Sequence, residues 1–475
     1  MENSTIAAIA TPGGRGGIGI IKISGSKALS IAAAIFSPAV SHASTHSDRS
    51  GAAKNVFADG FQSHRLFYGN IFDPGSRRVL DEVLLSVMKG PQSYTREDVV
   101  EINAHGGQIA VHAILELVLR QGARMAEPGE FTKRAFLNGR IDLTQAEAVI
   151  DIINARTDRS LLVAAAQVNG TLSKAVEEIR HCLVELLTRT EAGIDFPDEV
   201  DEIIDPAAAT VEIEAAVIQP LQRLIQQHAD GNVLRDGLKV AVVGRPNVGK
   251  SSLLNCLVKK KRVIVTDLPG TTRDTIEEAF NVNGFPIVLT DTAGLHDTRD
   301  PIETIGIEKT IENVNGADLI LLVIEANRAL TNDDHKIFKQ FRSKPTIVVI
   351  NKIDLVNHDK LVEMPADWSS SKSVRVSALY DRGMEALKDQ IVATAFGENP
   401  IGLDSGIIPN LRQKLLLDDS LKAALAIRRE LNNGNPMELI AIQLQDAIDA
   451  LGQILGTTVK VDVLDQIFSR FCIGK

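Results

Sequence analysis

The sequence predicts a multidomain α/β protein in which a doubly wound α/β domain is inserted into a helical domain that follows an N-terminal α+β domain. Up to about residue 140, short β-rich runs alternate with Gly/Pro turns. From residue 142, and again after residue 404, apolar residues recur at three- and four-residue steps, as in amphipathic helices. Between residues 238 and 395, buried-type apolar runs alternate with helical segments, which is typical of a parallel sheet covered by helices.

The same patterns predict the individual elements in chain order. Strands are expected at 18–23, 83–88, 240–243, 287–289, 319–324 and 346–350. Helices are expected at 109–120, 143–153, 161–187, 411–431, 437–455 and 463–471, with a break at 193–197. A further helical stretch runs to about residue 228, and Pro220 predicts a kink or a break within it.

Helices with one apolar face need partners, so the two helical stretches are expected to pack together. The predicted domains are 1–141 (N-terminal α+β domain), 142–236 (first part of the helical domain), 237–398 (inserted domain) and 399–475 (second part of the helical domain).

Length and composition set the limits of this interpretation. The chain has 475 residues, roughly three times the ~150 residues of a typical domain. Hydrophobic residues make up 44% and charged residues 24%, which excludes a wholly disordered, collagen-like or disulfide-framework protein. The net charge of −10 gives no overall attraction to nucleic acid or an anionic membrane, so a polyanion would have to bind at a local basic patch.

The cysteines and the apolar runs indicate a soluble protein of a reducing compartment. Three scattered cysteines do not predict a disulfide framework, so a cytoplasmic location is expected. The start of the chain does not resemble a signal or transit peptide. No apolar run approaches the ~20 residues needed to span a bilayer.

The segment 244–251 matches the phosphate-binding pattern G-x-x-x-x-G-K-S between a predicted strand and a helix. Its glycines let the backbone approach phosphate groups, which the amides of a helix N-terminus attract. Lys250 adds a cation and Ser251 a magnesium ligand. The residues expected to bind nucleotide here are Asn247, Val248, Gly249, Lys250, Ser251 and Ser252.

Three further segments follow predicted strands in the order expected of a GTP site. The first, Asp291-Thr292-Ala293-Gly294, is a weak signal alone; it would place a carboxylate near magnesium and a glycine near the γ-phosphate. The second, Asn351-Lys352-Ile353-Asp354, offers a carboxylate that can accept from N1–H and the exocyclic amine of guanine, which selects GTP over ATP. The third, Ser377-Ala378-Leu379, fits another loop that contacts the base. Together the four segments argue against an ordinary α/β domain.

This domain resembles the TRAFAC-class GTPases, which have a Ras-like fold, and residues 270–274 resemble the switch I signature of their translation-associated branch. The resemblance makes Thr272 the second magnesium ligand. Leu295 stands where Ras-like enzymes carry the glutamine that orients water, and Glu303 is a candidate for that role. The alternative for Glu303 is a surface glutamate that starts a helix. Switch I residues implied to contact nucleotide are Thr266, Asp267, Leu268, Pro269, Gly270, Thr271 and Thr272.

Over essentially the whole chain, the sequence resembles the MnmE (TrmE) family of tRNA modification GTPases. The segments that carry this resemblance are 10–19, 105–107, 128–138, 142–147, 195–199 and 470–475. Cys472, fourth from the last residue, could also suggest prenylation, but Gly474 and Lys475 suit that signal poorly.

The resemblance implies a folate-binding N-terminal domain and a homodimer formed through it. It also implies a partner, MnmG (GidA), which uses FAD and NADH and joins this chain in a heterotetramer or larger complex. Together they would add a carboxymethylaminomethyl-type group at C5 of the wobble uridine, U34, of certain tRNAs, with a one-carbon unit from a tetrahydrofolate derivative. GTP hydrolysis would require Mg²⁺ and also K⁺, which would bring two G domains together and act where an arginine finger would.

The resemblance also implies site residues. The potassium ligands would be Asn247, Thr266, Leu268 and Thr271, and Glu303 would orient the attacking water. The folate ligands would be Lys22, Glu101, Arg140 and Lys475. Lys22 replaces an arginine and Arg140 a lysine of the family pattern, which keeps the charge but alters the contact geometry.

Cys472 has two possible roles in this interpretation. It could be a nucleophile in uridine C5/C6 chemistry, or a thiol positioned near the folate site. No histidine lies nearby in sequence to activate the thiol as a nucleophile, so the positioning role is favoured.

Two alternative functions would require other sequence features. A regulatory or ribosome-assembly GTPase such as Era or Der should carry a KH module or a second P-loop, and the sequence shows neither. A non-enzymatic folate-binding or scaffolding protein would not need the complete set of GTP motifs.

Overall fold

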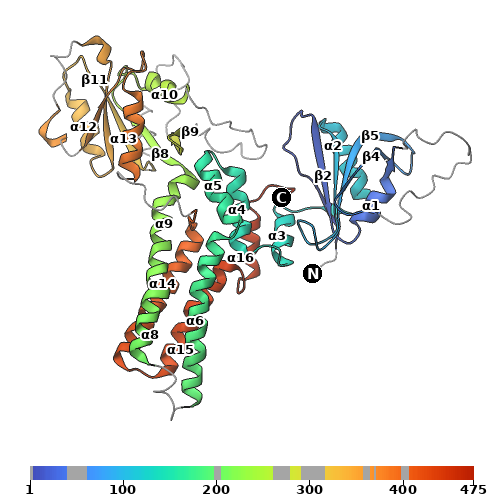
Figure 1. Cartoon of the computed structure of the whole chain (residues 1–475). Helices are drawn as coiled ribbons and strands as arrows, with labels where there is room; N and C mark the ends of the chain where they lie inside the picture. Colours follow the sequence, from blue (N-terminus) through green and yellow to red (C-terminus); the bar gives the residue numbers. More distant parts are fainter. Residues whose placement is uncertain are drawn as a thin grey trace, which may run out of the picture. The chain divides into compact units, whose positions relative to one another are not determined.

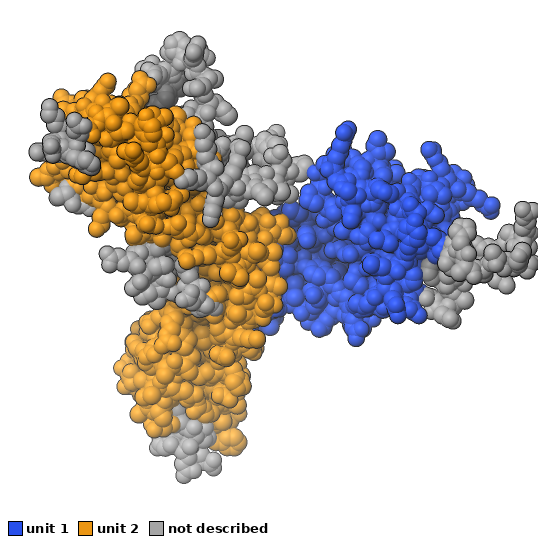
Figure 2. All heavy atoms as spheres, turned by 45° about the horizontal axis from the view of Figure 1, so that its top comes forward, with its two compact units in different colours: residues 1–150, 267–272, 455–475 blue, residues 151–266, 273–454 orange. Residues whose placement is uncertain are grey.

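The computed structural model describes residues 4–39, 61–196, 205–259, 279–289, 316–356, 364–368, 371–396 and 406–475. These form two compact units, shown in Figure 2. Unit 1 takes its described residues from 1–150 and 455–475, and unit 2 takes its own from 151–266 and 273–454. The predicted division into three domains stays a prediction, because the division into compact units gives only two.

Unit 1 contains a seven-stranded, largely antiparallel sheet of order β3-β4-β5-β6-β2-β1-β7 (Figure 1). Helices α1 (Ala28–Ile35) and α2 (Gln108–Arg120) share one buried core with the sheet. This is the expected α+β arrangement. The strands are β1 (Ile6–Ile9), β2 (Ile18–Ser24), β3 (Phe36–Pro38), β4 (Arg65–Phe72), β5 (Val79–Met88), β6 (Val99–His105) and β7 (Arg124–Met125).

A smaller helical core completes unit 1. It joins α3 (Glu130–Leu137), the first turns of α4 (Leu143–Asn154) and α16 (Val461–Phe468). The last helix therefore packs against residues more than 300 positions earlier, and this contact fastens the segment after residue 455 to the N-terminal part of the chain. The buried residues at the centre of this core are Leu143, Ala146, Leu464, Phe468 and Phe471.

The helices of unit 2 come from both sides of the inserted domain, as expected. Helix α14 packs on α8 and α9, and Gln167 of α5 donates to the carbonyl of Ile408 just before α14 (2.6 Å). The helices are α5 (Asp158–Val168), α6 (Thr171–Asp195), α8 (Pro206–Ile213), α9 (Gln219–Asp236), α14 (Leu411–Asn433) and α15 (Met437–Leu455).

Pro220 does not break the helix. The chain stays helical from Pro206 to Asp236 through a π-helical turn, η2 (Glu214–Ile218), in which the amide of Gln219 donates to Glu214. Proline has no amide hydrogen and clashes with the carbonyl four residues earlier. The wider π-turn directly before Pro220 accommodates this defect without ending the helix.

The inserted domain is the predicted doubly wound sheet, of order β13-β12-β11-β8-β10-β9 (Figure 1). All neighbouring pairs are parallel except β9 and β10. Alternate residues of β8 enter two different cores, so both faces are covered. The strands are β8 (Leu238–Val243), β9 (Ala279–Val282), β10 (Phe285–Leu289), β11 (Leu319–Glu325), β12 (Thr346–Asn351) and β13 (Lys372–Arg375); the helices are α10 (Lys250–Lys259), α12 (Asn332–Gln340) and α13 (Met384–Phe396).

In an open sheet of this kind, ligands bind at the carboxyl ends of the parallel strands. Val243, Glu325, Asn351 and Arg375 are the last residues of β8, β11, β12 and β13, and they therefore mark that edge. Across the described part of the chain, no helix is both long and apolar enough to cross a bilayer.

Candidate functional site

The loop from β8 to α10 has a backbone that two glycines make possible. Gly244 has φ +150°, and a Cβ there would lie 2.4 Å from the carbonyl oxygen of Val323 on β11. Gly249 has φ +98°, and a Cβ there would lie 2.3 Å from Nδ2 of Asn351. Neither the dihedral angles nor the space suits another residue. The loop is therefore pressed directly against β11 and the end of β12.

Lys250 begins α10 and folds back over this loop. Its Nζ donates to the carbonyls of Gly244 (2.8 Å) and Arg245 (2.9 Å). Ser251 is exposed in the first turn of α10, whose amides and dipole favour anions. Arg245 donates through Nε to the fully buried Asp334 at the start of α12 (2.9 Å), which fixes the outer side of the loop. The arrangement can bind a phosphate chain.

The predicted base-binding segments lie against the same loop. Asn351 donates through Nδ2 to the carbonyl of Val248 (3.0 Å) and accepts through Oδ1 from the amide of Ala378 (3.1 Å). Lys352 donates through Nζ to the carbonyl of Asn247 (2.7 Å). The hydroxyl of Ser377 donates to Asp354. The structure thus brings together three of the predicted segments, 247–252, 351–354 and 377–379.

Sequence reasoning missed Glu325 at this site, as well as Asp334, which holds Arg245. Glu325, the last residue of β11, lies opposite Asn351 in the sheet register and is buried. Its carboxylate forms an ion pair with Lys352, and its other oxygen lies 3.3 Å from Nε of Arg328. The signal that could have found it is a carboxylate directly after the six apolar residues 319–324.

The remaining predictions for the GTP site lie outside the described residues. Of the predicted magnesium and potassium ligands, only Ser251 and Asn247 are described. The roles given to the others stay predictions. The residues concerned are Thr266, Asp267, Leu268, Pro269, Gly270, Thr271, Thr272, Asp291, Thr292, Ala293, Gly294 and Glu303.

A second candidate site lies in unit 1, where the residues predicted to bind folate come together. Lys22 on β2 pairs in register with Glu101 on β6, and Nζ lies 3.6 Å from Oε1. The same Nζ is 5.5 Å from the ring centroids of both Tyr94 and Phe131. Arg140 also lies over the Tyr94 ring, with its Cζ 4.8 Å from the ring centroid. The amide of Phe131 donates to the carbonyl oxygen of Lys475 (3.2 Å).

Burial destabilises the charged form of Lys22. Burial lowers the pKa of its ammonium group below the ordinary value; Glu101 opposes this shift and Lys475 adds to it. A carboxylate, several cations and two aromatic rings in one place can bind a flat heterocycle with an anionic tail. Cys472 is exposed, and its carbonyl accepts from the amide of Gly129 (3.4 Å). The described residues contain no cluster of three or more metal-ligating side chains.

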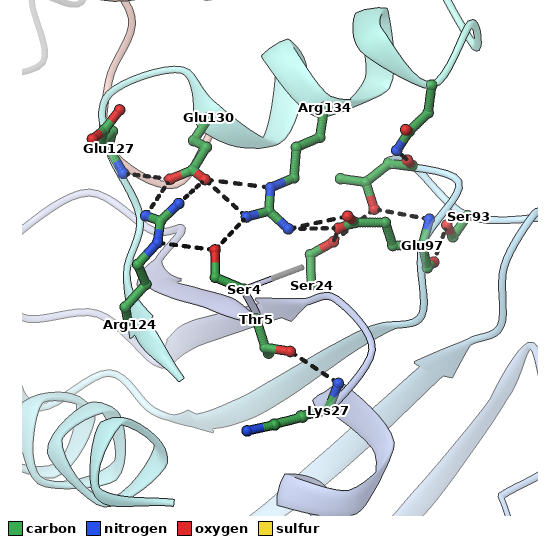
Figure 3. A network of polar contacts seen from close by, with 12 residues as sticks. Ser4, Thr5, Ser24, Lys27, Ser93, Glu97, Arg124, Glu127, Glu130 and Arg134 are labelled. Carbon is green, nitrogen blue, oxygen red and sulfur yellow. Dashed lines mark hydrogen bonds and ion pairs between the residues drawn. The ribbon is translucent and has the colours of Figure 1, made fainter. Parts of the chain in front are cut away.

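A network of charged residues, centred on the buried Glu130, supports this second site (Figure 3). Glu130 accepts from Arg124 (2.8 Å), from Arg134 (2.9 Å) and from the amide of Glu127 (2.9 Å). Arg134 donates to both carboxylate oxygens of Glu97, each at 3.0 Å. Burial alone would raise the pKa of Glu130, but these hydrogen bonds bring it below the ordinary value.

The network joins α3, which carries Phe131, to the loop that carries Tyr94. The hydroxyl groups of Tyr94 and Thr132 are also hydrogen-bonded, at 3.0 Å. These contacts therefore help to hold Tyr94 and Phe131, the two aromatic side chains of the site, in position. Sequence reasoning gave these residues no role, because the contacts that join the two segments, Arg134–Glu97 and Tyr94–Thr132, link residues 37 and 38 positions apart.

Two family models match the chain. A family model described as GTP-binding protein TrmE N-terminus matches residues 5–140, and one described as MnmE helical domain matches residues 143–472. The tRNA modification GTPase MnmE of Alkaliphilus oremlandii is 44% identical over 474 residues, which is 100% of this chain and 99% of the relative. That of Moorella thermoacetica is 44% identical over 479 residues, 100% of both chains. The chain belongs to the MnmE family.

Membership of the MnmE family confirms the resemblance inferred from the motifs. Together with the phosphate-binding loop, it makes the chain a GTP hydrolase. It argues against a GTPase of the Era or Der type, because the match to MnmE extends over the whole chain. It also argues against a scaffold without enzymatic activity.

Proposed function

We propose that this chain hydrolyses GTP as part of the modification of tRNA at the wobble uridine, U34. With an FAD- and NADH-using partner, MnmG (GidA), it adds a carboxymethylaminomethyl-type group at C5 of that base, using a one-carbon unit from a tetrahydrofolate derivative. The observation that carries this proposal is the full-length match to relatives that bear the name tRNA modification GTPase. The homodimer and the MnmG complex belong to the same proposal.

The folate derivative would bind at the second candidate site. Glu101 can accept from the amino and ring N–H groups of a pterin, and Lys22, Arg140 and Lys475 can meet its anionic tail. The geometry around Tyr94 supports this assignment, because Lys22 and Arg140 both lie over its ring and Glu101 pairs with Lys22. The folate would supply the one-carbon unit; the chain's residues bind and orient it.

At the GTP site, Ser251 and Thr272 would hold Mg²⁺, and Glu303 would orient the attacking water. Asn247, Thr266, Leu268 and Thr271 would hold K⁺ beside the phosphates, where its charge replaces that of an arginine finger and brings two G domains together. One feature of the described loop supports this role. Asn247 has φ +66°, and Lys352 binds its carbonyl, so the residue is held in a defined conformation.

Nucleoside mass spectrometry of tRNA tests the main proposal. In cells that lack this chain, C5-modified uridine at position 34 should disappear, and it should return when the chain is restored. A strain lacking the partner serves as the positive control. Unchanged modification without this chain would contradict the proposal.

GTP hydrolysis in different salts tests the potassium assignment separately. We expect the rate to be at least about tenfold higher in K⁺ than in Na⁺ at equal ionic strength, since a cation of the right size can offset the charge that develops on the phosphates. Asn247→Ala should abolish the difference between the two salts. Equal rates for the unaltered chain would remove the role given to Asn247.

A further inference from the structure

The carboxylate of Glu325 stands at the junction of the two halves of the GTP site. Its side chain is only 6% exposed. A buried carboxylate destabilises a fold unless charged partners and hydrogen bonds compensate for the lost water. Here one oxygen pairs with Lys352, whose side chain is 30% exposed, and the other lies 3.3 Å from Arg328, whose side chain is 68% exposed. Lys352 is therefore the more sheltered partner.

Lys352 in turn reaches from the base-binding segment to the phosphate-binding loop. Its Nζ donates to the carbonyl of Asn247, and its Cε lies 3.9 Å from the position of a Cβ on Gly249. A lysine side chain has four rotatable bonds, so holding it in one conformation costs considerable entropy. A fixed charged partner can offset this cost. The buried carboxylate of Glu325 supplies that partner.

We propose that Glu325 is a positioning residue for nucleotide binding. It holds the Lys352 ammonium group in place, and Lys352 then holds the carbonyl of Asn247 and the shape of the phosphate-binding loop. Asn351 makes a second link to the same loop through Val248. The base-binding segment and the phosphate-binding loop are thus joined through Lys352 and Asn351, and Glu325 supports this link without being among the residues expected to contact the nucleotide. This inference rests on the GTPase activity alone and does not depend on the proposed role in tRNA modification.

Equilibrium titration with a fluorescent GDP analogue and with GTP tests the proposal in the full-length chain. Glu325→Gln removes the charge with little change in shape, and we expect the Kd of both nucleotides to rise roughly tenfold, the effect of one charge-assisted hydrogen bond. The hydrolysis rate at saturating GTP should stay within about twofold of the unaltered rate, because the reacting groups are untouched. The ratio of GTP to ITP affinity should not change, since Asp354 reads the exocyclic amine.

Two controls separate this effect from a general one. Glu385→Gln makes the same chemical change in the ion pair with Lys388 of α13, where the Glu385 side chain is 70% exposed, and it should leave the Kd unchanged. Arg328→Gln removes the exposed partner of Glu325 and should change the Kd by less than about twofold, because exposed ion pairs contribute little. A large effect of Arg328→Gln with none of Glu325→Gln would overturn the proposal.

A double-mutant cycle decides whether Glu325 acts through Lys352. In the Lys352→Met background, Glu325→Gln should weaken binding no further. Unchanged affinity in the single variant, or a full tenfold loss in the Lys352→Met background, would contradict the proposal. If Glu325→Gln does not fold by circular dichroism, Glu325→Asp replaces it. That variant keeps the charge and shortens the side chain, so its Kd should rise about threefold to fivefold, and unaltered affinity would count against the proposal.

Discussion

The GTP site and the second candidate site are built in different ways. At the GTP site, the described contacts run mainly from side chains to the main chain of one short loop: Lys250 binds the carbonyl of Gly244, and Lys352 that of Asn247. At the second site, side chains from different elements contact one another, as Lys22 and Arg140 do around Tyr94. The first kind of site depends on backbone conformation, and the second depends on the elements being held at the right distance.

Lys250→Met should produce the largest effect and should separate the two sites. Loss of a cation beside the transferring phosphoryl group is expected to lower GTP hydrolysis about 10²–10³-fold. Folate binding should stay unchanged, because the contacts described for Lys250 are with the carbonyls of its own loop. Steady-state phosphate release and folate titration measure the two quantities. The control is Lys336→Met, a lysine whose side chain is 78% exposed on α12. A parallel loss of folate binding would show that the two sites are not independent.

Glu130→Gln should weaken the support of the second site without touching the ligand. Removing one partner from the buried network leaves Arg134 poorly compensated, and we expect the local free energy of unfolding of α3 to fall by about 2–3 kcal/mol at pH 7. Hydrogen exchange of the α3 amides measures this.

The pH dependence of that effect has a definite sign. The folded-state pKa of Glu130 is lowered, so its contribution is complete above the ordinary value of about 4.3 and is lost as pH falls through the folded-state pKa. The difference between the unaltered chain and Glu130→Gln should therefore shrink below about pH 4. A difference that is constant from pH 7 to pH 3 would mean that packing, rather than charge, is responsible.

Glu101→Gln should act on the ligand of the second site alone. The neutral amide keeps an acceptor oxygen but loses the charge, so the Kd for a tetrahydrofolate derivative should rise about tenfold while GTP hydrolysis is unchanged. Isothermal titration measures the affinity. Glu116→Gln, on the exposed side of α2, is the matched control. Equal affinity in both variants would remove Glu101 from the folate site.

Cys472→Ser should have the smallest effect on binding. The side chain is exposed, so folate affinity and GTP hydrolysis should each change by less than twofold, as for most surface substitutions. Modification of U34 by the complete system then separates the two roles considered for this thiol. Retained modification supports positioning, whereas complete loss with both affinities intact would support a nucleophile.

The difference between the sites also explains what the sequence could predict. The phosphate-binding loop is one continuous motif between a strand and a helix, so its place in the sheet followed from residues 239–257 alone. The links that complete the site, from Glu325 to Lys352 and from Asn351 to Val248, join segments that are separated in the chain, and no motif shows which residues pair. The folate residues were found through a family pattern, but Tyr94 and Phe131, which lie between them, were not.

Two local features show where sequence patterns are weaker. Pro220 predicted a kink or a break, and the break does not occur, because a π-helical turn keeps the helix continuous; such turns have no clear sequence signal. The antiparallel pair β9–β10 was not predicted as a hairpin, although Asn283-Gly284, with φ +51° and +92°, is a strong hairpin signal. The flanking strands have only four and five residues, so their apolar pattern is too short to indicate a hairpin.

The links from Asn351 and Lys352 to the phosphate-binding loop have a consequence for biosynthesis. They span 103 and 105 residues of sequence, and both donors follow the loop in the chain. A ribosome adding about 5–20 residues per second needs roughly 5–20 s to cover this distance. During that interval, the loop has been made but lacks the side chains that hold its carbonyls. The nascent chain therefore acquires a complete nucleotide site only after β12 has joined the sheet beside β11 and the later segment 377–379 has been synthesised.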